Sequence, residues 1–363
     1  QVLALNSADV AALNTTQTAV LDTAQAVAIE TSDLLALSTA ALRTLSTAAV
    51  AALDTNQILA LTTEQVTALY TTQIEALTSN QVVALESTDL AILNSAQAAV
   101  LNATQAGAIE TTDLAELSVN AVHALSTDAI SGMNTSQIAN LSSAQIEALN
   151  TAQAAALNTA QAAAIETTDI AALSSAAVTN LSTASIAALS TDQILNFNTN
   201  QIAALTTDQL QHLNTAQLGA LETNDIVAFS SAHVFALTSE QITALNTADI
   251  QILNTVQVQA INTEAFQVLH TDQIVSLNAD QFVALTTDQI AHLTATQMLA
   301  METNDLQVLS TTQFAALSTD AIAAMTTADI VAMTTTQILA LDTAHIAAFN
   351  TLDIVALSVD HIQ

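Results

Sequence analysis

Large apolar residues recur at every eighth position of the chain, from Leu5 to Leu357, without an insertion or a deletion. We name the eight positions a to h, so that Leu61 lies in column a and Ala68 in column h. Column f is also almost always apolar, and column h is mostly alanine. Columns a, f and h are therefore expected to face inward.

A continuous α-helix cannot carry this pattern, because eight residues at about 100° each move the apolar face by about 80° per repeat. The chain must therefore bend once per octad. Column b is Asn, Ser, Thr or Asp in 37 of 45 octads, and column e, three residues later, is Gln or Asp in 34 of 45. This is the spacing of a helix capping box. We predict a new helix in each octad, with caps such as the pairs Asn150 with Gln153 and Asn158 with Gln161.

Each helix would occupy columns c to h, with the Ser or Thr of column c as its first helical residue. Isolated helices this short are unstable in water, so they must be stabilised by stacking. The pattern thus predicts an all-α solenoid, or superhelix, of very short capped helices with one helix per octad. Its core would include Leu61, Val66, Leu69, Ile74, Leu77, Leu157 and Leu205.

A β-solenoid is the alternative fold, since a tight repeat without insertions would suit it. The composition argues against this alternative. Three glycines and no proline leave the corners of such a coil without their usual residues, while Ala, Gln and Leu favour helix.

One continuous array, residues 1–363, is the expected domain organisation, because no linker and no shift in composition divides the chain. The octad pattern begins and stops in mid-repeat, at Gln1 and Gln363. Solenoids usually end in atypical capping repeats, so we expect the sequence to be a segment of a longer chain.

The formal net charge is −32, with 33 acidic residues and the single basic residue Arg43. Nucleic acid is a poor partner for such a chain, because phosphate binding needs clustered Lys and Arg. Membrane insertion is not expected either, because the longest apolar run, residues 48–53, is far shorter than the roughly twenty residues of a membrane-spanning helix. Cysteine is absent, so disulfides and thiolate sites are excluded.

The sequence predicts no catalytic residue and no cofactor-binding residue, and we expect the protein not to be an enzyme. The candidates for a metal site are six octads with Glu in column b and Asp in column e, where two carboxylates could share a calcium ion. Helix capping without a metal is the favoured interpretation, because calcium usually takes six to eight oxygens. These pairs are Glu30 with Asp33, Glu86 with Asp89, Glu110 with Asp113, Glu166 with Asp169, Glu222 with Asp225, and Glu302 with Asp305.

Octads such as LTTEQVTA at 61–68, LSTDQILN at 189–196 and LTTDQIAH at 285–292 carry a Leu-[Ser/Thr]-Thr-x-Gln-[Ile/Val]-x-Ala motif. This motif resembles octapeptide repeats of very large secreted or surface proteins of Gram-negative bacteria. The resemblance covers the whole chain. It implies export to the cell surface or the extracellular space and an adhesive or fibre-forming role.

The sequence therefore favours a structural repeat protein that forms part of an extracellular filament, sheath or adhesin stalk. Its expected partners are identical chains in a fibre. The alternative is a surface-binding module that uses the Ser/Thr and acidic columns, either on ice or in cation-dependent adhesion.

Overall fold

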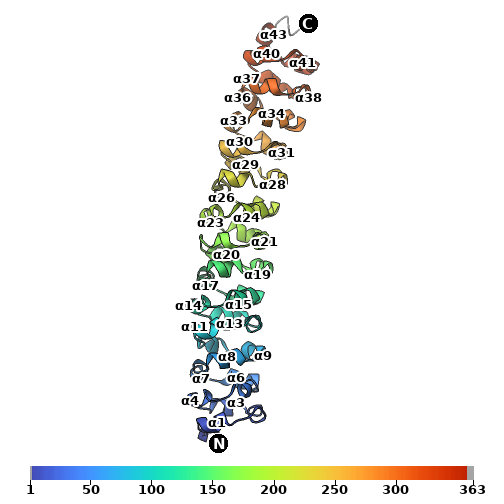
Figure 1. Ribbon diagram of the computed structural model, residues 1–363. Helices are drawn as coiled ribbons and strands as arrows, with labels where there is room; N and C mark the ends of the chain where they lie inside the picture. Colours follow the sequence, from blue (N-terminus) through green and yellow to red (C-terminus); the bar gives the residue numbers. More distant parts are fainter. Residues whose placement is uncertain (1, 358–363) are drawn as a thin grey trace. The chain divides into compact units, whose positions relative to one another are not determined.

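The computed structural model describes residues 2–357 and divides the chain into two compact units, Gln1–Leu189 and Ser190–Gln363. All regular structure in the described residues is helical, which confirms the all-α prediction (Figure 1). The first unit contains η1 (Val2–Ala4), α1 (Ser7–Ala11), α2 (Thr15–Thr18), α3 (Thr23–Val27), α4 (Thr31–Leu34), α5 (Thr39–Leu42), α6 (Thr47–Ala52), α7 (Thr55–Leu59), α8 (Thr63–Ala68), α9 (Thr71–Ala76), α10 (Ser79–Val83), α11 (Ser87–Ala91), α12 (Ser95–Ala98), α13 (Ala103–Ala108), α14 (Thr111–Leu114), α15 (Val119–Ala124), α16 (Thr127–Gly132), α17 (Thr135–Ala139), α18 (Ser143–Glu147), α19 (Thr151–Ala156), α20 (Thr159–Ala164), η2 (Ile170–Ala172), α21 (Ser175–Asn180) and α22 (Thr183–Ala187).

The second unit contains α23 (Thr191–Leu195), α24 (Thr199–Ala204), α25 (Thr207–Gln211), α26 (Thr215–Gly219), α27 (Thr223–Ile226), α28 (Ser231–Ala236), α29 (Ser239–Ala244), α30 (Thr247–Ile252), α31 (Thr255–Ala260), α32 (Thr263–Gln267), α33 (Thr271–Val275), α34 (Ala279–Ala284), α35 (Thr287–Ala291), α36 (Ala295–Ala300), α37 (Thr303–Val308), α38 (Thr311–Phe314), α39 (Thr319–Ala324), α40 (Thr327–Ala332), α41 (Thr335–Leu339), α42 (Thr343–Ala348) and α43 (Thr351–Ala356). The predicted array extends beyond the described residues at both ends, and its continuity over residues 1–363 stays a prediction.

Every α-helix begins at column c, as the capping pattern predicts, and ends after four to six residues. After a six-residue helix such as α8, two extended residues lead to the next helix, and after a shorter helix such as α7 an αR residue comes first. At Leu69 φ and ψ are −56° and 136°, and at Tyr70 they are −68° and 154°. The described residues contain no positive φ, so the bend needs no glycine. This explains how a chain with so few glycines and no proline can turn once in every octad.

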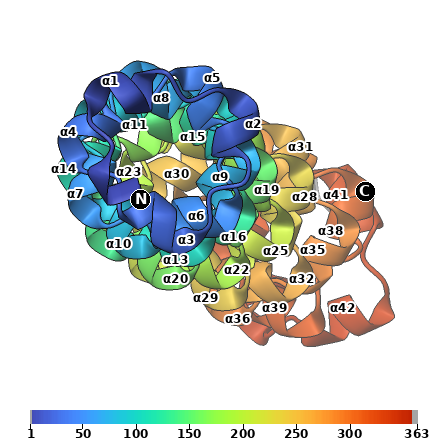
Figure 2. The ribbon, with the colours of Figure 1, turned by 90° about the horizontal axis from the view of Figure 1, so that it is seen from below.

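In each unit a helix packs on the helix three octads further along the chain, for example α5 on α8 and α31 on α34. Hydrogen bonds between neighbouring coils join residues that are 25 to 31 positions apart, so one coil takes between three and four octads. Figure 2 shows this arrangement in the first unit, where α4, α7 and α14 gather on one side of a ring and α2 and α5 on the other.

Columns a and f form the core, as the octad pattern predicts. The residues Leu61, Val66, Leu69, Ile74, Leu77, Leu157 and Leu205 are all buried, with at most 5% of each exposed. The prediction for column h is wrong, because its alanines are mostly half-buried. The third buried column is e, which carries glutamine in more than half of the octads, and this exchange places a polar residue inside the coil.

Candidate functional site

The recurring site of the molecule is the buried glutamine of column e. In α8, Gln65 is 2% exposed, and its Oε1 accepts a hydrogen bond from the backbone N–H of Thr62 at 2.9 Å. Its Nε2 donates to the carbonyl oxygens of Leu34 at 3.0 Å and Leu37 at 2.9 Å, in the preceding coil. One side chain therefore caps its own helix and also bonds its coil to the coil before it. We call this arrangement the glutamine pin.

The pin repeats with the same geometry in both units. Its acceptors lie 31 and 28 residues earlier, in columns f and a, as for Gln241 with the carbonyls of Leu210 and Leu213 at 2.8 Å each. In the predicted caps, Gln153 donates to Val122 and Leu125, and Gln161 to Ile130 and Met133, at 2.8 to 2.9 Å. The partners Asn150 and Asn158 complete two-way capping boxes with these glutamines. A buried amide with all its groups bonded fixes the register between coils.

The interpretation of column e as a capping position alone missed this second role. A signal was present in the sequence, because column e often carries Gln and never its charged counterpart Glu, whereas column d carries several acids. A preference for the amide over a carboxylate of the same length is typical of a buried position.

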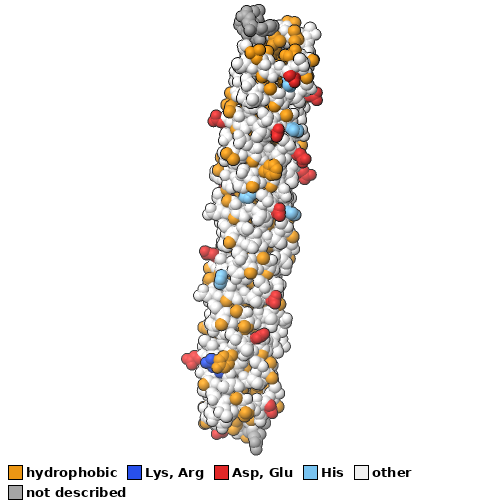
Figure 3. All heavy atoms as spheres, turned by 90° about the vertical axis from the view of Figure 1, so that its right-hand side faces the viewer, with side chains coloured by type: hydrophobic (Ala, Val, Ile, Leu, Met, Phe, Trp, Pro, Cys, Tyr) orange, Lys and Arg blue, Asp and Glu red, His pale blue; other side chains and the backbone are white. Residues whose placement is uncertain are grey.

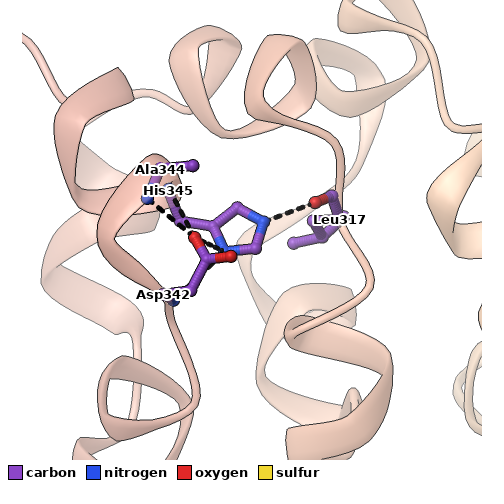
Figure 4. Close-up of polar contacts among 4 residues, drawn as sticks. All are labelled: Leu317, Asp342, Ala344 and His345. Atoms are coloured by element: carbon purple, nitrogen blue, oxygen red, sulfur yellow. Dashed lines mark hydrogen bonds and ion pairs between the residues drawn. The ribbon is translucent and has the colours of Figure 1, made fainter.

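Within the described part of the second unit, histidine takes the place of the pin glutamine at His233 in α28 and at His345 in α42. In α42, Nδ1 of His345 accepts from the backbone N–H of Asp342 at 3.2 Å, while Nε2 lies 2.7 Å from the carbonyl oxygen of Leu317 (Figure 4). A neutral ring with its proton on Nε2 satisfies these two contacts. Nδ1 also lies 3.0 Å from Oδ1 of the Asp342 carboxylate. The carboxylate of Asp342 caps the helix by accepting from the N–H groups of Ala344 and His345, each at 2.9 Å. The bond from the His345 backbone is the largest of the effects that lower the pKa of Asp342.

Octads with alanine in column e use direct packing instead of the amide. In α15, Ser118 caps the N–H of Ala121 in one direction only, at 3.2 Å. Five of the helices with such an alanine, α6, α15, α16, α21 and α39, make the most extensive contacts with the helix three octads before them, whereas α5 and α32 do not. In α16 the close approach also depends on Gly132 in column h, because a Cβ there would lie 2.3 Å from the carbonyl oxygen of Ala103. A small side chain in column e thus allows helix-to-helix contact in place of hydrogen bonds.

The six Glu and Asp pairs have two different environments. All six glutamates are exposed, and Glu30, Glu86, Glu110 and Glu222 make no side-chain capping bond. The prediction that these glutamates cap their helices is therefore wrong for these four residues. The aspartates are buried or half-buried, because they occupy the column of the pin.

Hydroxyl groups of the preceding coil bond several of these aspartates. Asp33 Oδ1 accepts from Ser7 Oγ, and Asp113 Oδ1 from Ser87 Oγ, each at 2.5 Å. Asp169 accepts in the same way from Ser143, and Asp225 from Thr199 at 3.4 Å. Each donor lies in column c of the coil before. These carboxylates therefore contact the protein itself. Among residues 2–357, no group of three or more His, Asp or Glu side chains is arranged to hold a metal ion.

Burial raises the pKa of Asp89, Asp225 and Asp305 above the ordinary carboxyl value, and the neighbouring glutamate of column b adds to this effect. A bond from the backbone of that glutamate opposes it. The carboxylate cannot donate to the column a and f carbonyls as an amide does. Asp249, in another octad, is an example of a carboxylate that is left with an unsatisfied oxygen: its Oδ1 is buried and has no hydrogen-bond partner. Aspartate is thus a weaker substitute for glutamine in column e.

On the surface, two residues that depart from the octad pattern form a pair. The guanidinium carbon of Arg43, in column g, lies 4.1 Å from the centroid of the Tyr70 ring, in column b of the next coil. This is a cation–π contact. Figure 3 shows one face of the molecule, where acidic side chains are scattered over a mostly uncharged surface. Within the described residues, no helix is long and apolar enough to span a bilayer.

A comparison with family models shows what this architecture is related to. The ALTTAQ repeat model matches residues 26–63, 106–143, 162–199, 195–223, 218–255, 242–279, 258–295 and 298–335. These segments together cover more than half of the chain. No curated protein matches the sequence. The matches confirm the octapeptide-like repeat, and the chain belongs to the ALTTAQ repeat family.

Proposed function

We propose that the protein is a structural segment of an extracellular filament, sheath or adhesin stalk. The observation that carries this proposal is the glutamine pin, which recurs in both units and bonds coil to coil with the same geometry in each. Because every coil is stabilised mainly by its neighbours, octads can be added without a change in the fold. Such a design supplies length and lateral surface, and it needs no reacting group.

The distribution of charge supports an extended structural role. The 33 acids and single base repel other copies of the chain, so lateral association would need cations to screen the acids. We expect identical chains to be the main partner. The resemblance to surface-protein repeats supports a position at the cell surface or outside the cell.

The alternative, an ice-binding surface, finds less support in the geometry. Such a surface would need a flat, free row of hydroxyls in column c. Several of these hydroxyls, including Ser7, Ser87 and Thr303, instead donate to aspartates of the next coil.

Electron microscopy of the purified chain, with and without millimolar calcium, tests the proposal. We expect elongated particles of uniform width that associate side by side or end to end as the acids are screened. Short globular particles under all conditions would contradict a structural role in a filament or stalk. A thermal hysteresis assay at millimolar protein tests the ice-binding alternative separately.

A further inference from the structure

Phe235 lies in column g of α28, and its side chain is 64% exposed. The other six phenylalanines occupy columns a and f and are at most 8% exposed. The core therefore does not account for the aromatic side chain at this position. An exposed phenyl ring that the fold does not use is a candidate contact for a partner.

A surface groove of about 940 Å³ opens beside Phe235. Three carboxylates line the groove, those of Glu240, Glu264 and Asp288. They lie in column d of α29, α32 and α35, each three octads after the one before, so each comes from a successive coil. All three are exposed. The residues Ser190–Gln363 include no Lys or Arg, so no such side chain of this unit neutralises the groove.

A contact in the first unit shows which kind of side chain can pack on an exposed aromatic ring of this surface. Arg43 in column g stacks on Tyr70, which lies in column b of the next coil. Phe235 and Asn262 have the same columns and the same separation, but here the aromatic residue is in column g and no cation faces it.

The Asn262 side chain is already committed to the backbone. Its Nδ2 donates to the carbonyl oxygens of Phe235 at 2.9 Å and Leu237 at 3.1 Å, and its Oδ1 accepts from Ala265 N at 2.9 Å. These bonds hold the backbone at the rim of the groove. They leave the Phe235 ring available to a ligand.

We propose that this groove binds an arginine side chain of a partner protein. The flat guanidinium stacks on the phenyl face while its N–H groups donate to the carboxylates of column d. Arginine fits better than lysine, because its planar group makes both contacts at once. A second copy of this chain is not the occupant, since its one basic side chain, Arg43, lies on its own Tyr70.

Fluorine NMR of the full chain, labelled with 4-fluorophenylalanine, tests the proposal at the site itself. Because six of the seven phenylalanines are buried, one resonance reports on an exposed ring, and the variant Phe235→Leu assigns it. We expect a tetra-arginine peptide to shift this resonance saturably while the six others stay unchanged. A tetra-citrulline peptide, which has the same shape without the charge, should not shift it.

Calorimetry with the same peptides measures the contributions of the groove. Phe235→Leu should weaken binding about two- to five-fold, the range of an exposed cation–π contact. Glu264→Gln should also weaken it. Asp320→Asn is the matched control, because it removes an exposed column d acid outside the groove.

Three outcomes would overturn the proposal. One is the absence of a saturable shift of the Phe235 resonance, and another is an equal shift with the citrulline peptide. The third is an equal loss of affinity in Asp320→Asn and Glu264→Gln, which would show general attraction to the net charge. None of these outcomes bears on the structural role, because Phe235→Leu and Glu264→Gln leave in place the hydrogen bonds that Gln289 and Asn262 make between coils.

Discussion

The octads of α8 and α27 differ in how columns b and e cap the helix and bond it to the preceding coil. In α8, Thr62 and Gln65 form a two-way capping box, and the glutamine amide bonds the preceding coil. In α27, Glu222 makes no side-chain cap, and Asp225 only accepts a hydrogen bond from the preceding coil. The chain thus alternates between octads that hold neighbouring coils by amide donors and octads that lack such a donor.

Helix length does not separate the two kinds of octad. The Glu and Asp octads form helices of four residues in α4, α14 and α27 but of six residues in α37, and α12 and α38, which contain a pin, also have four residues. The aspartate of column e cannot form the pin for two reasons. Its side chain is shorter than that of glutamine, and its carboxylate has no N–H group to donate to the carbonyls of the preceding coil. We infer that the Glu and Asp octads are the least stable steps in each unit, where local opening would begin.

The largest effect is expected from removal of a pin. Gln153→Ala breaks the bonds to Val122 and Leu125 and leaves buried carbonyls without this donor. It should lower the free energy of unfolding by about 2–4 kcal/mol. Urea denaturation, with hydrogen exchange of the two flanking coils, measures the loss and its location.

Gln25→Ala is the matched control for this variant. Gln25 caps Asp22 in the same way but is exposed, so only the cap is lost. It should cost about 0.5–1 kcal/mol. Equal costs at the two positions would show that the contacts between coils contribute nothing beyond the cap.

A smaller change, an increase in the free energy of unfolding, is expected when glutamine replaces the aspartate of column e in a Glu and Asp octad. Asp89→Gln places a donor at the same spacing from the carbonyls of Ile58 and Leu61 as Gln65 has from those of Leu34 and Leu37. It should stabilise the protein at pH 7 by about 1 kcal/mol for each hydrogen bond formed. The variant Asp89→Asn removes the charge without the reach of glutamine, and it should recover only part of this gain in urea denaturation.

The effect of pH separates these contributions. Burial raises the pKa of Asp89 in the folded state above its value in the unfolded chain. The contribution of Asp89 to the free energy of unfolding is therefore fully present below the unfolded pKa and is lost as the pH rises through the folded pKa. The gain from Asp89→Asn should therefore shrink as the pH falls from 7 to below 4. A gain that is independent of pH would contradict the assignment of a buried charge.

The smallest effect is expected at the histidine pin of α28. Burial lowers the pKa of His233, so the stability that its neutral ring gives is present above the unfolded value of about 6.5 and is lost as the pH falls through the folded value. The wild-type protein should lose about 1 kcal/mol or less of its free energy of unfolding in this way, and the variant His233→Gln should not show this loss. Thermal unfolding of both proteins between pH 7.5 and 5 measures the difference, and parallel curves would show that His233 does not titrate in this range.

Much of the fold was predictable because the repeat is local. Column a sets the period, and the spacing of columns b and e sets the helix start, so Asn150 and Gln153 could be named as a cap before any coordinates. The close contact of Arg43 and Tyr70 was not predictable, because the two residues belong to different octads and only the coil brings them together. The same applies to the groove at Phe235.

The sequence by itself determined that each octad is a short capped helix with an apolar core face, because hydrophobic period and capping depend on residues within one repeat. Only the tertiary structure decided that columns e and h exchange places in the interior. That choice depends on how many octads complete a coil, since the carbonyls that bind Gln65 come from residues 28 and 31 positions away. In the superhelix, the glutamine that caps a helix therefore also bonds one coil to the coil before it.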